Sequence, residues 1–95
     1  MILWESERLD QFLGPNTYTW EEMQSILGIL LTTEERPMIR QAGIQMWERR
    51  YQQRPPGEQK WPNQNPNWSN QNARDRHNMS DLRELIIQGI KGAEY

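Results

Sequence analysis

Apolar residues recur at spacings of three and four between Thr19 and Tyr51, which is the pattern of amphipathic helices. In the first half of this stretch they are Met23, Ile26, Leu27, Leu30 and Leu31. In the second half they are Met38, Ile39, Ala42, Met46 and Trp47. The pattern predicts two helices, over residues 20–31 and 33–51, each with an apolar stripe that must be covered by another part of the protein.

The starts of both helices carry a capping signature. Thr19 is followed three residues later by Glu22, and Thr32 is followed by Glu35. In such a capping box the threonine oxygen accepts a backbone N–H of the first turn, while the glutamate accepts the N–H of the cap residue. Because the second box comes directly after the first helix, we expect the two helices to turn sharply against each other.

One further helix is predicted on each side of this pair. The first covers residues 3–13, with a partial stripe of Trp4, Leu9, Phe12 and Leu13, and Gly14-Pro15 ends it. The last covers residues 73–93, with a stripe of Met79, Leu82, Leu85, Ile86 and Ile90. Between them, residues 52–72 contain five Gln, five Asn and four Pro, a composition that cannot bury enough apolar area to offset its ordering entropy. We expect a long polar loop there.

The length of 95 residues allows one domain, residues 1–95, with one modest core. Every predicted element is helical. The expected fold class is therefore all-α, a small bundle of about four helices with the long polar loop before the last one. The chain has no cysteine, which excludes disulfides, thiol catalysis and cysteine-ligated zinc.

The net charge and the first ten residues indicate which partners and which cellular location to expect. The net charge of −2 provides no overall field that would attract a nucleic acid. A helix-turn-helix interpretation of the short joint at residues 31–34 conflicts with this charge and with the acidic starts of both helices. The first ten residues become charged soon after Trp4, unlike a signal peptide or membrane anchor. We expect a soluble cytoplasmic protein with no nucleic-acid and no membrane partner.

The residues that could carry chemistry have simpler interpretations. Glu21-Glu22 and Glu34-Glu35 resemble paired carboxylates, but adjacent helical side chains point about 100° apart. Acidic residues in a first turn also complement the helix dipole. His77 is the only histidine. We expect no enzymatic activity, no catalytic residues, no metal site and no cofactor, because no acid, base and nucleophile converge.

Two tryptophans are expected to be structural anchors. Trp20 follows a cap residue at the start of a central helix, and Trp68 precedes the last helix, so each ring can seal the seam between helix ends. Truncation of a buried tryptophan costs roughly 3–5 kcal/mol. Trp61 lies in the polar loop with no helix to brace it, and we expect it to contribute much less.

Several motifs occur in a recognisable order. Thr19-Trp20-Glu21-Glu22 runs into Leu30-Leu31-Thr32 and Glu34-Glu35, and Pro66-Asn67-Trp68 stands before the last helix. Further along, the last helix has arginine, apolar, glycine and alanine residues at a known family's positions, with no insertion or deletion between them. They are Arg76, Met79, Arg83, Leu85, Ile86, Gly89 and Ala93. This order closely resembles the gammaretrovirus-type Gag capsid N-terminal domain, and the similarity covers most of the chain from about Leu9 onward.

The resemblance implies a truncated capsid module. In the family, a β-hairpin and a first helix precede the equivalent of residues 3–13, and this chain lacks both. It also lacks the C-terminal capsid domain and the zinc knuckle, for which cysteines are required. The module is expected to be either a fragment of a viral Gag, which would reside in the virion, or an endogenous, host-captured remnant with its own start codon.

The expected function is a non-enzymatic module that associates with itself as a homodimer or small oligomer. Without the family's first helix, two apolar stripes lose a covering layer, and a bare patch of that kind is rare on a soluble monomer. A second copy is the simplest cover. The predicted self-association residues are Leu9, Phe12, Leu13, Ile26, Leu30 and Met46. The alternative is a restriction-type adaptor that binds retroviral capsid or Gag and interferes with assembly.

Overall fold

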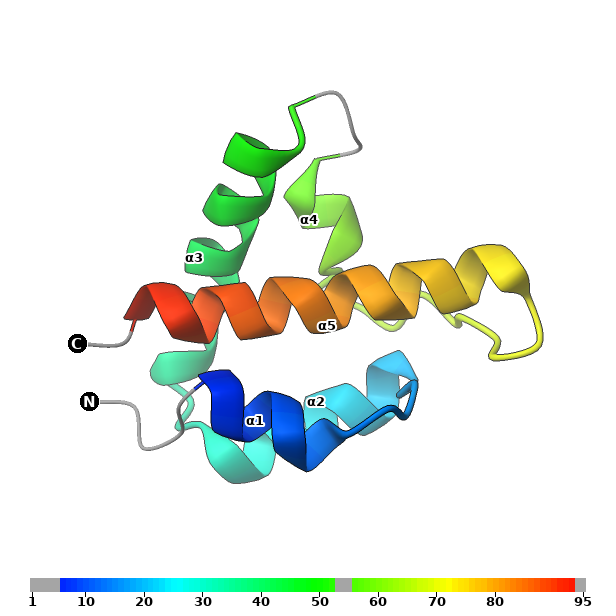
Figure 1. Ribbon diagram of the computed structural model, residues 1–95, viewed down its shortest axis with the longest axis horizontal. Coiled ribbons are helices and arrows are strands. Elements are labelled where there is room, and N and C mark those ends of the chain that lie inside the picture. Colours follow the sequence, from blue (N-terminus) through cyan, green and yellow to red (C-terminus); the bar gives the residue numbers. More distant parts are fainter. Residues whose placement is uncertain (1–5, 53–55, 94–95) are drawn as a thin grey trace.

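The computed structural model describes residues 6–52 and 56–93, and all regular secondary structure in these ranges is α-helical (Figure 1). The longer helices are α1 (Ser6–Leu13), α2 (Trp20–Leu30), α3 (Glu35–Arg50) and α5 (Ala73–Ala93), and α4 (Gly57–Lys60) is a single turn. The predicted all-α class and the small helical bundle are confirmed. Residues 3–5 of the first predicted helix lie outside the described residues.

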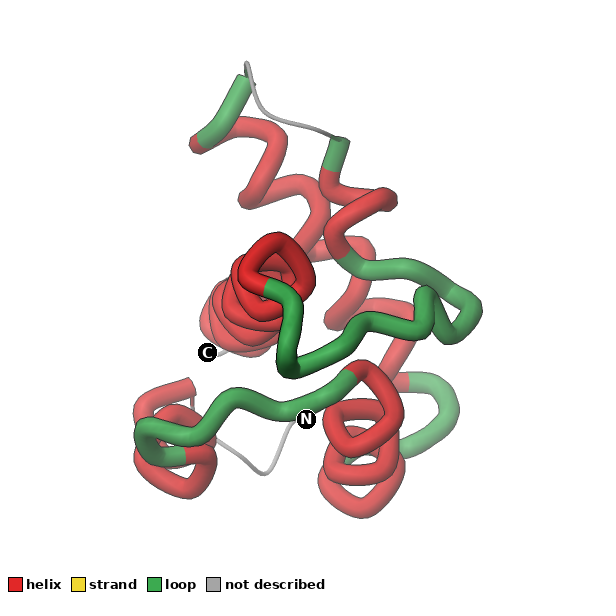
Figure 2. Tube along the Cα trace, turned by 90° about the vertical axis from the view of Figure 1, so that its right-hand side faces the viewer, coloured by secondary structure: helices red, strands yellow, loops and turns green. Residues whose placement is uncertain are grey.

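Helix α5 runs through the middle of the molecule (Figure 1). In this view α3 crosses α5, so that its C-terminal half and α4 lie above α5, and α1 and α2 lie below it. The view turned by 90° keeps this vertical order, with α1 and α2 on separate sides at the bottom (Figure 2). The last helix of the chain is therefore the element on which the other helices assemble.

Both capping boxes form at the central pair. The Thr19 N–H donates to Glu22 Oε1 at 2.9 Å, and the Glu22 N–H donates to Thr19 Oγ1 at 3.2 Å. The bonds to the Thr19 backbone and side chain lower the pKa of Glu22. Thr32 and Glu35 repeat the arrangement at 2.9 and 3.1 Å. These bonds close the turn between the two helices, and α3 itself begins at Glu35, with Glu34 as an N-cap that makes no side-chain bond.

The closest approach of two helices is the crossing of α3 and α5. A Cβ built on Gly43 would stand less than 3.0 Å from the Leu85 carbonyl oxygen. A Cβ built on Gly89 would stand equally close to the Ile39 carbonyl oxygen. In both cases the obstacle is backbone, which cannot rotate away as a side chain can. The two glycines therefore allow the backbones of α3 and α5 to touch.

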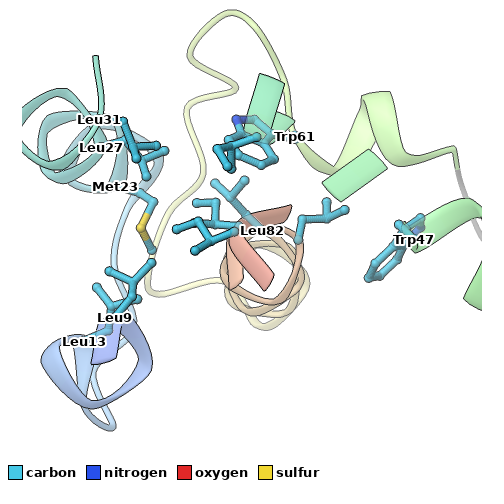
Figure 3. Packing of buried hydrophobic residues seen from close by; sticks show 12 residues of the cluster. Leu9, Leu13, Met23, Leu27, Leu31, Trp47, Trp61 and Leu82 are labelled. Carbon is cyan, nitrogen blue, oxygen red and sulfur yellow. The ribbon is translucent and has the colours of Figure 1, made fainter. Parts of the chain in front are cut away.

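The core joins α1, α2 and α3 to α5. Figure 3 shows the Met23 side chain of α2 between Leu27 of the same helix and Leu9 of α1. Leu82 of α5 lies between this group and Trp47 of α3. The fully buried side chains of the core are Leu9, Leu13, Met23, Leu27, Ile39, Met79, Leu82, Leu85, Ile86 and Ile90. Each helix of eight or more residues contributes to this set.

Arg83 of α5 fastens the end of α1. Its guanidinium donates to Asp10 Oδ1 at 2.7 Å and to the Gly14 carbonyl oxygen at 2.6 Å. Gly14 has a φ of +62°, a conformation that glycine adopts without strain, so it ends the helix. A single arginine thereby satisfies acceptors at the exposed end of α1.

The segment predicted as a polar loop is in part a core element, and this corrects the sequence interpretation. It contains α4 and Trp61, whose side chain is only 4 % exposed. Arg40 of α3 donates to the Trp61 carbonyl oxygen through Nε at 3.1 Å and Nη2 at 2.8 Å. Gly57 brings α4 close to α3, because a Cβ there would lie 3.0 Å from the Ile44 Cα. An average polar composition does not reveal a single anchored tryptophan.

The burial of Trp61 reverses the order in which the three tryptophans were expected to contribute to stability. Trp20 and Trp68 are partly buried and pack against the core, whereas Trp61 belongs to it. We expect Trp61→Ala to cost about 3–5 kcal/mol and to lower the melting temperature by more than about 10 °C, at roughly 4–8 °C per kcal/mol. Thermal unfolding followed by circular dichroism measures this. Larger losses for both Trp20→Ala and Trp68→Ala than for Trp61→Ala would contradict the prediction.

The helix crossing makes a second prediction. Gly43→Ala and Gly89→Ala should each destabilise by about 1–3 kcal/mol, because the helices must separate to admit the methyl group. Gly28→Ala and Gly92→Ala are matched controls in helices, since their Cβ atoms meet only an ordinary contact or open space. The controls should gain up to about 1 kcal/mol from better helix propensity. Chemical denaturation compares all four, and a stabilised Gly43→Ala variant would show that the crossing is loose.

Candidate functional site

Two of the predicted self-association residues are not on the surface. Leu9 is 1 % exposed and Leu13 is 0 % exposed within the single chain. The helix that carries them, α1, packs against α5, and Figure 3 shows both leucines facing Met23 of α2. The premise that these side chains lack a cover is therefore wrong. Phe12, on the same helix, is 57 % exposed.

Helix α2 carries an apolar flank beside its buried stripe. Ile26 and Leu30, both predicted for self-association, are partly buried and pack at the edge of the core. Ile29 is 83 % exposed. Spacings of three and four residues place Ile26, Ile29 and Leu30 next to each other on one side of the helix. These three residues are the α2 flank, and the sequence pattern missed Ile29 because it lies outside the stripe that faces the core.

Met46, the remaining predicted residue, lies in a different place. It lines a hollow of about 310 Å³ between the C-terminal half of α3 and α5. We call this the α3–α5 hollow, and its lining includes Gly43, Met46, Trp47, Leu85, Arg49 and Arg50. Met46 is 37 % exposed. The structure thus separates Met46 from the α2 flank with which the sequence interpretation grouped it.

One edge of the α3–α5 hollow is held by a polar group of contacts. The Tyr51 hydroxyl donates to Glu84 Oε1 at 3.0 Å, and Arg50 Nη1 lies 3.4 Å from the same oxygen. The Arg50 guanidinium also stands over the Tyr51 ring, 5.5 Å from its centroid. Trp47 and Tyr51 pack with their ring centroids 4.5 Å apart. These contacts hold the aromatic wall in place beside the open apolar space.

A wider groove of about 650 Å³ runs between α2, α3 and the segment after α4. Its lining includes Gln24, Arg36, Arg40 and Glu48. The Arg40 guanidinium donates its hydrogen bonds to the Trp61 carbonyl oxygen. The buried Gln24 Nε2 has no hydrogen-bond partner among the described residues. The arginine, glutamate and amide side chains that line the groove offer polar contacts.

A buried ion pair joins α4 to α5. Lys60 Nζ lies 2.9 Å from Asp81 Oδ2 and donates to Asn78 Oδ1 at 2.9 Å. His77 Nε2 is 3.4 Å from the same Asp81 oxygen, but its side chain is largely exposed. The Lys60 contact with Asp81 is one of charge, because that oxygen has no well-aligned donor among the described residues. Lys60 and Asp81 are 8 % and 5 % exposed. Because the pair is buried between the two helices, it holds α4 against α5.

One predicted anchor tryptophan, Trp20, contacts the segment that follows α4, and the other, Trp68, is part of that segment. The Trp20 indole Nε1 donates to the Pro62 carbonyl oxygen at 3.1 Å. Trp68 lines a smaller hollow with Lys60 and Pro62. The Asn65 side chain donates to Glu21 Oε1 and ties the same segment to α2. Pro62 and Asn65 thus tie the segment to the first turn of α2.

Comparisons of the chain with known protein families, curated proteins and solved structures found no match. Within the described part of the chain, no helix is long and apolar enough to cross a membrane. The same residues contain no group of three or more His, Cys, Asp or Glu side chains that could hold a metal ion. The candidate functional features are therefore the α2 flank and the α3–α5 hollow.

The buried ion pair makes a stability prediction. Asp81→Asn or Lys60→Met alone should cost about 3–5 kcal/mol, because each leaves an unpaired charge or an unmatched polar group inside. The double variant Lys60→Met/Asp81→Leu should recover most of this loss, since neither charge remains. Glu84→Gln at the more exposed Arg50 pair is the control, with a cost of about 1 kcal/mol or less. Denaturant unfolding that shows additive losses in the double variant would contradict the assignment.

Proposed function

We propose that this chain is a non-enzymatic, self-associating capsid-type module, related to the Gag capsid proteins that its motifs resemble. The observation that carries the proposal is the α2 flank, an apolar strip on which Ile29 is 83 % exposed. Met38 and Phe12 add further exposed apolar side chains, at 61 % and 57 %. A second copy that covered the α2 flank would remove this apolar area from water, which favours association.

Two other features support the proposal. The order of motifs from Thr19 to Ala93 resembles one family in particular, and an all-helical module with a long connection before its last helix is what that resemblance implies. The cavities of the described residues offer no convergent set of catalytic groups. Such a module acts either as part of a viral Gag, in the virion, or as a captured remnant in the cytoplasm.

Sedimentation velocity and light scattering over a range of micromolar concentrations test the proposal. We expect a mass that rises above 11.5 kDa, the mass of one chain, as the concentration increases. Ile29→Asp should shift the midpoint of association at least tenfold in concentration, because it places a charge on the apolar strip. It should leave the melting temperature almost unchanged, since the side chain is exposed.

Gln11→Glu is the matched control, because it adds the same charge at an exposed position on α1. It should associate like the unmodified protein. A single 11.5 kDa species at every concentration would overturn the proposed function.

A further inference from the structure

The two apolar features found above belong to elements on either side of α5 in the view of Figure 1. The α2 flank belongs to a helix below α5 in Figure 1, whereas the C-terminal half of α3, which lines the α3–α5 hollow, rises above α5. Figure 2 shows the same vertical separation from a second direction. The hollow has no lining residue from α2.

Their shapes are complementary. Ile29 is a branched aliphatic side chain that projects from α2 with 83 % of its surface exposed. The α3–α5 hollow, of about 310 Å³, is lined by apolar parts of Met46, Trp47 and Leu85. If the Ile29 side chain entered an apolar hollow of this size, its apolar surface and that of the lining side chains would both be removed from water. Within one chain they cannot meet, but between two chains they can.

Their charges are complementary as well. Residues 6–35, which include α1 and α2, carry six carboxylates and one arginine, and of these carboxylates Asp10 pairs with Arg83 of α5. Residues 36–50 carry four arginines and one glutamate. Arg49 and Arg50 lie at the α3–α5 hollow. Arg50 pairs with Glu84, and the structure gives Arg49 no ion-pair partner among the described residues. An acidic surface that approaches the hollow would meet a basic one, which steers and orients association.

We propose that the α2 flank of one copy docks into the α3–α5 hollow of a second copy, with Ile29 as the inserted side chain. The inference rests on the proposed self-association and specifies its geometry. After one such contact each pair retains one free flank and one free hollow, so the contact can continue head-to-tail into a ring or an open chain. In a two-fold homodimer, the simplest assembly expected from the sequence, the same two copies would make the contact reciprocally.

Two single variants separate the partners of the contact. Ile29→Asp blocks the flank and leaves the hollow intact. Met46→Glu places a carboxylate in the hollow and leaves the flank intact. Arg49→Glu, at an exposed position beside the hollow, is a second hollow variant in case Met46→Glu unfolds the protein. Each variant alone should be monomeric at concentrations where the unmodified protein is oligomeric.

The decisive measurement is the equimolar mixture of a flank variant and a hollow variant. The intact hollow of the first can accept the intact flank of the second, so the mixture should form a complex of two chains that cannot grow. Light scattering and native mass spectrometry measure its mass. Arg49→Gln should weaken the association of the otherwise unmodified protein several-fold and reduce its salt dependence, whereas Arg74→Gln, exposed at the start of α5, should leave both unchanged.

The outcomes distinguish this inference from the proposed function. If the unmodified protein is monomeric throughout, the proposed function fails and the inference fails with it. If the unmodified protein associates but the mixture of variants stays monomeric, self-association stands and the head-to-tail contact is overturned. If Met46→Glu abolishes association while Ile29→Asp does not, another side chain such as Phe12 occupies the hollow, and Ile29 is overturned as its partner.

Discussion

The contact between the backbones of α3 and α5 at Gly43 and Gly89 is the constraint on which the rest of the structure depends. Two helices this close leave no room for a side chain at the crossing, so the neighbouring residues must pack around it. Ile39 and Leu85 supply the carbonyl groups that meet the glycines, and both have buried side chains. The α3–α5 hollow borders the same crossing, because Gly43 and Leu85 are both among its lining residues.

The segment between α3 and α5 shows how a polar stretch can become part of a core. Trp61 supplies the apolar area, and Arg40 holds its carbonyl group in place. The ion pair of Lys60 with Asp81 attaches the preceding turn to α5. A buried pair of this kind is weak evidence for net stabilisation, since desolvation opposes the attraction of the charges. Its clearer effect is positional, because it fixes α4 against α5 in one register.

The same packing decides which apolar residues remain for a partner. Once α1 and α2 place Leu9 and Met23 against the core, Ile29 on α2 remains 83 % exposed, with little cover from the described residues. Near the C-terminal end of α3, Met46 stands beside an open space that no side chain of the described residues fills. The separation of these features by α5 favours a contact between unlike surfaces over one between like surfaces.

The sequence by itself determined the four longer helices, because caps and apolar stripes depend on residues three or four positions apart. The Thr19–Glu22 and Thr32–Glu35 boxes form as the spacing predicts. Only the tertiary structure decided the burial of Leu9 and of Trp61 and the exposure of Ile29, since each depends on contacts with segments distant in the chain. The α3–α5 hollow was equally hidden from the sequence, because an empty space between two helices leaves no pattern along either one.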